Sequence, residues 1–76
     1  MNKVRREKIK KAIKFLDSAK VIVDSILGEE QDSFDNLNEN FQDSEKGEKM
    51  EEAIGNLDDA IDYIDSAVES LEEAAQ

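Results

Sequence analysis

A seven-residue repeat in the C-terminal part of the chain constrains the fold more than any other feature. From residue 51 the sequence reads EEAIGNL, DDAIDYI, DSAVESL and EEAAQ, four successive copies of one template. Apolar residues recur every seven positions at Met50, Leu57, Ile64 and Leu71. Seven residues make about two turns of α-helix, so the repeat aligns these side chains along one side of a helix.

The apolar stripe of this helix is three positions wide in each heptad. Small and branched apolar residues stand three and four positions after the Met50 series: Ala53, Ala60, Ala67, Ala74, Ile54, Ile61, Val68 and Ala75. A two-stranded coiled coil needs only two apolar positions per heptad, whereas a helix with several neighbours needs more. We therefore expect the Met50 series to line a core or an interface, with Tyr63 covering its edge.

The N-terminal half has the same period. Ile9, Leu16 and Val23 are seven residues apart, and Ala12, Ala19 and Ile26 follow each of them by three. This pattern predicts a helix from about residue 3, but its end has two interpretations. Gly28 is able to stop a helix at Leu27, whereas the stripe continues to Phe34 and favours an end near Asn36.

The start of the second helix has clearer signals. Asp43 or Ser44 is a suitable N-cap, and Glu45 and Glu48 place negative charge in the first turn. The two helices have matched lengths, which favours an antiparallel hairpin that forms a single domain over residues 1–76. We expect helices over about 3–36 and 44–75, with a connector over about 37–43.

The region between the helices, QDSFDNLNENFQDSEKGE, is longer than a helical hairpin needs, since about 2–8 residues suffice. Three apolar residues, Phe34, Leu37 and Phe41, lie among its polar side chains. We interpret them as a cap that closes the end of the hairpin over Met50.

The size of the chain favours self-association. A chain of 76 residues rarely builds a core worth more than about 3–5 kcal/mol, and the sequence has no cysteine for a disulfide. Two helices also leave part of each wide stripe uncovered. The sequence therefore predicts an all-α fold in which two hairpins pair as a homodimeric four-helix bundle.

Charge is strongly segregated along the chain. Residues 1–20 hold eight basic and two acidic residues, a net charge of +6, and residues 21–76 carry −16. We expect the basic segment to be neutralised inside the hairpin by acidic residues near the C-terminus. Direct binding of nucleic acid is disfavoured because the remaining −16 repels phosphates and no aromatic residues read bases.

An acidic ridge follows the Met50 series along the second helix. Its members are Glu51, Glu52, Asp58, Asp59, Asp65, Glu72 and Glu73, with Ser66 completing the third pair. Such a ridge usually keeps a small protein in solution. The alternative function is an acidic inhibitor that imitates DNA and binds a basic surface on a nucleic-acid-binding protein.

The sequence lacks the residues of most catalytic and metal sites. Histidine and cysteine are absent, and three isolated glycines make no phosphate-binding loop. A calcium loop starting at Asp32 would need glycine at its sixth position, where Leu37 stands. We expect no enzyme activity, cofactor or metal site. With no apolar run of about 18 residues and no apolar segment behind the charged residues 1–11, we expect a cytoplasmic protein without a membrane span.

Nearly two thirds of the chain, residues 28–74, resembles a group of short, uncharacterised acidic proteins of bacterial phages and mobile elements. The resemblance is most specific in the pattern EEQ-x-x-F-DNL-P-E-x-x-Q-x-SE-x-GE-x-ME-x-A. It is matched by Glu29, Glu30, Gln31, Phe34, Asp35, Asn36, Leu37, Glu39, Gln42, Ser44, Glu45, Gly47, Glu48, Met50, Glu51 and Ala53. Asn38 stands where the group often has proline. The resemblance implies a helical hairpin and a mobile-element setting, and no activity, since none is known for the group.

We therefore expect a non-enzymatic protein that acts through self-association and contact with another protein, of a kind that the sequence does not identify.

Overall fold

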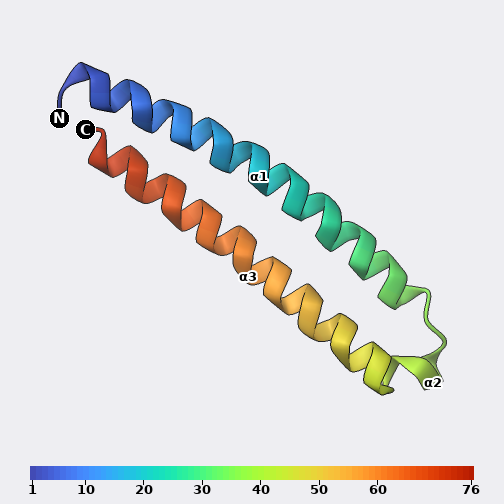
Figure 1. Cartoon of the computed structure of the whole chain (residues 1–76). Coiled ribbons are helices and arrows are strands. Elements are labelled where there is room, and N and C mark those ends of the chain that lie inside the picture. The colour runs from blue at the N-terminus through green and yellow to red at the C-terminus, as the bar shows by residue number, and fades with distance from the viewer.

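The computed structural model describes all residues, 1–76, as two long helices and a short one between them (Figure 1). Helix α1 spans Lys3–Asp35, α2 spans Glu39–Gln42 and α3 spans Glu45–Ala74. The long helices lie side by side and run in opposite directions, with both termini at one end and α2 at the other. The predicted all-α helical hairpin is confirmed.

Helix α1 continues through Gly28 without a break. At its start the Asn2 side chain accepts a hydrogen bond from the Arg5 backbone N–H, at 2.8 Å. At its end the N–H of the C-cap residue Asn36 donates to the Asp32 carbonyl, at 3.0 Å. The apolar stripe therefore sets the length of α1, because packing along the whole helix outweighs the cost of about 1 kcal/mol for one glycine.

The connector contains a helix that the sequence pattern did not predict. The Asn38 side chain accepts the Asn40 N–H at 3.2 Å, and the Asn38 carbonyl accepts the Phe41 and Gln42 N–H groups at 2.8 and 3.1 Å. These bonds form α2, which has four residues. A short polar side chain at the N-cap starts this turn of helix, because it supplies an acceptor for an otherwise unpaired N–H group.

Ser44 is the N-cap of α3. Its Oγ accepts the Gly47 N–H at 3.4 Å, and it donates to the Phe41 carbonyl. Glu45 and Glu48 lie in the first turn, where the positive end of the helix dipole favours carboxylates. Helix α3 then continues to its C-cap, Ala75.

The two long helices meet along a seam of residues spaced alternately four and three apart. This seam, which we name the intrachain seam, consists of Ile9, Ile13, Leu16, Lys20, Val23, Leu27, Glu30 and Phe34 from α1 and Met50, Ile54, Leu57, Ile61, Ile64, Val68, Leu71 and Ala75 from α3. All are buried or half-buried. The Lys20–Asp65 ion pair marks the antiparallel register, in which Phe34 lies opposite Met50.

The hairpin is a single layer of helices. Its principal extents are 58 × 15 × 12 Å, and the smallest is about the diameter of one helix. The radius of gyration is 17.2 Å, against about 11 Å for a compact chain of this length. Only Gly47 and Ile61 are buried. A stable domain generally packs two layers around a core, and one chain supplies only one of them.

Candidate protein interaction surface

Large apolar side chains remain in solvent on one side of α1. The exposed fractions are 66% for Phe15, 61% for Ile22 and 43% for Ile26. These residues are spaced by seven and four, so they lie on one side of the helix, next to Ala12 and Ala19 at the edge of the intrachain seam. They form a row that stays largely exposed in the single hairpin.

The alanines of α3 lie on the same side of the hairpin as this row. Ala12 and Ala19 follow seam residues of α1 by three positions, and the α3 alanines follow the Met50 series by three. Antiparallel helices of the same hand place equivalent positions on the same side of their shared seam. We name this surface the apolar face: Ala12, Phe15, Ala19, Ile22 and Ile26 from α1 with Ala53, Ala60, Tyr63, Ala67 and Ala74 from α3.

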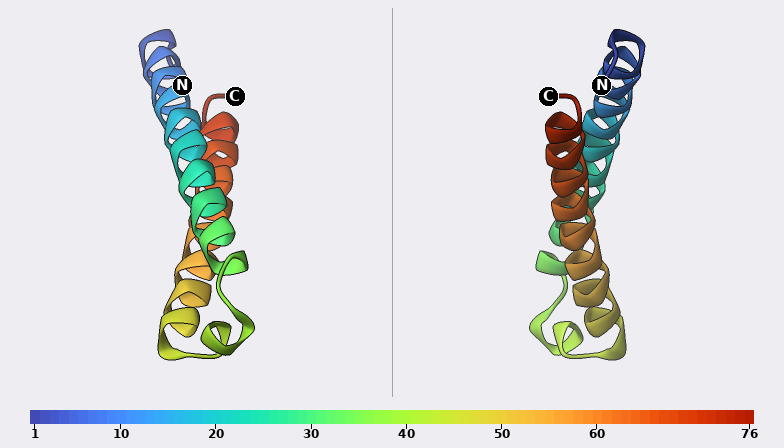
Figure 2. Two further views of the ribbon diagram at one scale, coloured as in Figure 1. Left: turned by 90° about the vertical axis from the view of Figure 1, so that its right-hand side faces the viewer. Right: turned by 90° about the vertical axis from the view of Figure 1, so that its left-hand side faces the viewer.

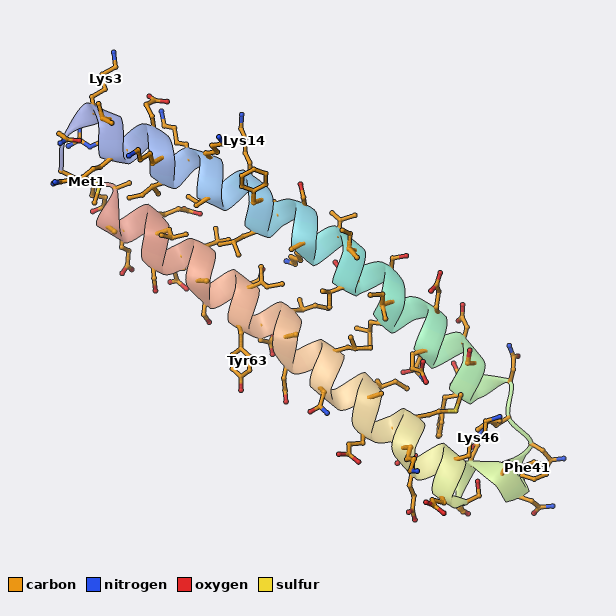
Figure 3. All side chains as sticks on the ribbon, in the orientation of Figure 1. Met1, Lys3, Lys14, Phe41, Lys46 and Tyr63 are labelled. Carbon is orange, nitrogen blue, oxygen red and sulfur yellow. The ribbon has the colours of Figure 1, made fainter.

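The residues of the predicted interface divide into two groups. Met50, Leu57, Ile64 and Leu71 are half-buried in the intrachain seam, where they stabilise the hairpin. Tyr63 is 72% exposed and points away from α1 (Figure 3). Its exposure is compatible with the predicted place at the edge of an interface, which stays a prediction.

The predicted cap over Met50 needs a correction. Phe34 and Leu37 are half-buried, but Phe41 is 58% exposed at the tip of the hairpin (Figure 3). A polar side chain holds this end instead, because the Gln42 amide donates to the Phe34 and Leu37 carbonyls, both at 3.3 Å. In α2 the ring of Phe41 therefore faces solvent while its neighbour Gln42 turns inward.

Gly47 has a packing role that no pattern in the sequence predicts. It is buried, and a Cβ at this position would lie 2.6 Å from the Phe41 carbonyl oxygen and closer still to that of Gln42. Only glycine lets the start of α3 approach α2 so closely. At Gly28 and Gly55, in contrast, an added Cβ would have no neighbouring atom within 4 Å.

One ion pair joins the two long helices. Lys20 Nζ lies 2.7 Å from Asp65 Oδ1. The hydrogen bond to Asp65 raises the pKa of Lys20 above 10.5, against a partial desolvation that lowers it, and the charges of Asp65, Asp24 and Asp17 add to the rise. Lys20 occupies a seam position, and its amine pairs with Asp65 on the side of the seam opposite the apolar face.

The basic segment is not neutralised inside the hairpin, contrary to the sequence-based expectation. Lys20 bonds to α3, and Lys10 lies 3.7 Å from Glu7 of its own helix. The other basic residues of the segment have no acidic side chain within 4 Å: Lys3, Arg5, Arg6, Lys8, Lys11 and Lys14. By the register of the hairpin, residues 3–8 extend beyond the last residue of α3, so no acidic side chain lies opposite them (Figure 2).

The acidic ridge lies on the side of α3 that faces away from the apolar face. All of its residues are exposed, and only Asp65 has a basic partner. The hollow nearest to it is open to solvent and is lined by Asp24, Leu27, Gly28, Gln31, Ile54 and Asp58. No three acidic residues converge in a way that would hold a metal ion. No helix combines the length and the apolar character that crossing a bilayer requires.

Comparison with protein-family models, with curated proteins and with solved structures finds no match for this chain.

Proposed function

We propose that this protein is non-enzymatic and acts through self-association, with two hairpins stacking their apolar faces to form a four-helix bundle. The observation that carries the proposal is the apolar face on a hairpin only one helix thick. A second hairpin supplies the missing layer and removes Phe15, Ile22 and Ile26 from water. Each such side chain contributes about 1.5–3 kcal/mol when fully buried.

The surface area of the hairpin supports the same proposal. The chain exposes 5776 Å², whereas a compact monomer of its mass exposes about 4,700 Å². The excess of about 1,000 Å² is similar to the roughly 800 Å² that each partner buries in an interface of standard size. A dimer would therefore restore the surface that is normal for a folded chain.

The acidic ridge supports a second candidate function, an inhibitor that imitates DNA. Its side chains are exposed along α3 and nearly free of basic partners. Seven carboxylates over residues 51–73 span about 33 Å, or one charge per 5 Å or so, which is sparser than the one charge per roughly 3.4 Å of a single DNA strand. We rank this function second because of the lower charge density. It predicts binding to a basic DNA-binding protein that duplex DNA and salt both abolish.

Two adjacent residues provide a matched test of self-association. Ile22 lies on the apolar face, and Val21, 68% exposed, lies on a different side of α1. We expect sedimentation equilibrium at micromolar concentration to give a dimer for the wild-type chain and for Val21→Asp. Ile22→Asp should be largely monomeric, because dimerisation would bury an unpaired carboxylate.

Both substitutions add one negative charge at an exposed helical position, so they control for general charge repulsion. A wild-type chain that sediments as a folded monomer would rule out the proposed function. Equal effects of the two substitutions would show that the apolar face is not the interface.

A further inference from the structure

We infer that the two α1 helices pair directly in the dimer, antiparallel to each other, around a two-fold axis that passes between Ser18 and Ala19. This inference rests on the proposed self-association and specifies its surface and its orientation. The observation that carries it is one row of α1 on the apolar side of the hairpin: Lys8, Phe15, Ile22 and Glu29, spaced by seven.

When a second copy of this row runs in the opposite direction, each charged residue faces an opposite charge and each apolar residue faces an apolar one. In the antiparallel arrangement Lys8 meets the partner's Glu29, and Phe15 meets the partner's Ile22. The two-fold axis repeats both contacts, as a symmetric dimer interface requires. All four side chains are exposed in the single hairpin, so none of them is committed to a contact within the chain. A parallel pairing of α1 would instead place Lys8 against the partner's Lys8 and Glu29 against the partner's Glu29.

The charges at the two ends of the hairpin favour the same orientation. At the end with the termini, residues 1–20 and 60–76 together carry a net charge of +1. At the other end, residues 21–59 carry −11. Parallel stacking of two hairpins would bring the two −11 ends together, whereas antiparallel stacking sets each of them against a nearly neutral end. Like charges across an interface suppress wrong arrangements.

The extension of α1 beyond α3 also acquires a partner in this arrangement. Residues 3–8 include Arg5, Arg6 and Lys8, which have no acidic partner in their own chain. Around the proposed axis this segment lies beside residues 29–34 of the partner subunit, where the partner's Glu29 and the partner's Asp32 carry negative charge. The basic segment is therefore neutralised by the partner chain in the dimer, although its own chain does not neutralise it.

Charge reversal tests the pairing directly. Lys8→Glu and Glu29→Lys each replace two attractive contacts per dimer with two repulsive ones, so each should raise the dissociation constant about tenfold. The double variant restores opposite charges in exchanged positions and should return the constant to within about threefold of wild type. Lys14→Glu controls for net charge, because Lys14 points to the outer side of α1 (Figure 3).

The chain has no cysteine, so engineered disulfides test the orientation without background. A mixture of Lys8→Cys and Glu29→Cys chains should form a disulfide-linked dimer under mild oxidation, and neither variant should do so when it is the only chain present. Efficient cross-linking of Lys8→Cys to itself, or to Ser70→Cys on α3 of the partner subunit, would overturn the inferred orientation.

The outcomes separate this inference from the proposed function. A dimer whose dissociation constant responds equally to Lys8→Glu and Lys14→Glu and is not restored in the double variant would retain self-association and reject the α1 pairing. A wild-type chain that is monomeric at all accessible concentrations would reject both.

Discussion

At the scale of single residues, the three glycines look alike in the sequence and have different surroundings in the fold. Gly28 and Gly55 lie in open helix surface, while Gly47 is buried against the backbone of α2. No glycine in the chain has a positive φ, so close approach, and not backbone conformation, explains Gly47. The sequence shows only that all three fall in or near helices. The contact that distinguishes Gly47 forms between backbone groups of α2 and α3 and leaves no pattern in the side chains.

We predict opposite effects of alanine at two of these positions. Gly47→Ala should lower the free energy of unfolding by about 1–3 kcal/mol, because the new methyl group overlaps backbone carbonyls that cannot move without opening the turn. Gly55→Ala should raise it by about 0.5–1 kcal/mol, because alanine reduces the entropy that the unfolded chain loses. Urea denaturation followed by circular dichroism measures both values. Equal effects of the two substitutions would contradict the close contact at Gly47.

The corner of the hairpin shows why the predicted apolar cap was only partly right. Phe34, Leu37 and Phe41 are the only large apolar residues of the connector region, so hydrophobicity favours all three as buried. In the structure α2 exposes Phe41, and Gln42 reaches the carbonyls of Phe34 and Leu37. The Phe34 carbonyl also accepts the Leu37 N–H, at 3.0 Å, and both carbonyls take up these positions only once α1 has stopped.

At the scale of the helices, the heptad pattern predicted their existence, type and approximate ends, because packing follows the same period as the sequence. It did not distinguish which two of the three apolar positions form the intrachain seam. The α3 seam takes the Met50 series with Ile54, Ile61, Val68 and Ala75, and it leaves Ala67 and Ala74 exposed. Larger side chains bury more apolar area, so they occupy the seam where a smaller neighbour competes. Lys20 and Glu30 break the pattern in α1, as polar residues in seam positions.

The seam position of Lys20 leads to a pH prediction. Because the bond to Asp65 raises the pKa of Lys20 above 10.5, this ion pair stabilises the hairpin below that pH, and the contribution is lost as the pH rises through the raised pKa. An NMR titration of the Lys20 side chain should give a pKa above the ordinary lysine value of 10.5. Asp65→Asn should return the pKa of Lys20 toward that value, while Asp62→Asn, on an exposed site without an ion pair, should not. An unchanged titration in Asp65→Asn would contradict the assigned cause.

At the scale of the whole molecule, matched helix lengths predicted the hairpin correctly, whereas the sequence left the uncovered side undefined. Phe15, Ile22 and Ile26 appeared only as a widening of the α1 stripe. The antiparallel register joins them with the α3 alanines on one side and puts the acidic ridge on the other. The pairing of the two helices therefore determines which side of the hairpin stays uncovered. The sequence pattern of either helix alone does not predict it.

If self-association supplies the second layer, stability should depend on protein concentration. Dimers gain about 1.4 kcal/mol for each tenfold rise in concentration, which should raise the melting temperature by roughly 3–5 °C per tenfold for a dimer of this size. Thermal melts followed by circular dichroism over a hundredfold concentration range measure this dependence. Ile22→Asp should melt at one temperature throughout the range. A wild-type melting temperature that does not change with concentration would contradict the coupling of folding to dimerisation.

Both termini lie at one end of the hairpin, and the opposite end is held by Gln42, Ser44 and Gly47. This arrangement has a mechanical consequence. A force that pulls the two ends of the chain apart acts across the intrachain seam, so it separates the helices one pair of seam residues at a time. Such unzipping would begin at Ile9 and Ala75 and stop at the end of the hairpin that holds α2. The helices would separate gradually at low force, whereas helices pulled along their axes would separate abruptly at a higher force.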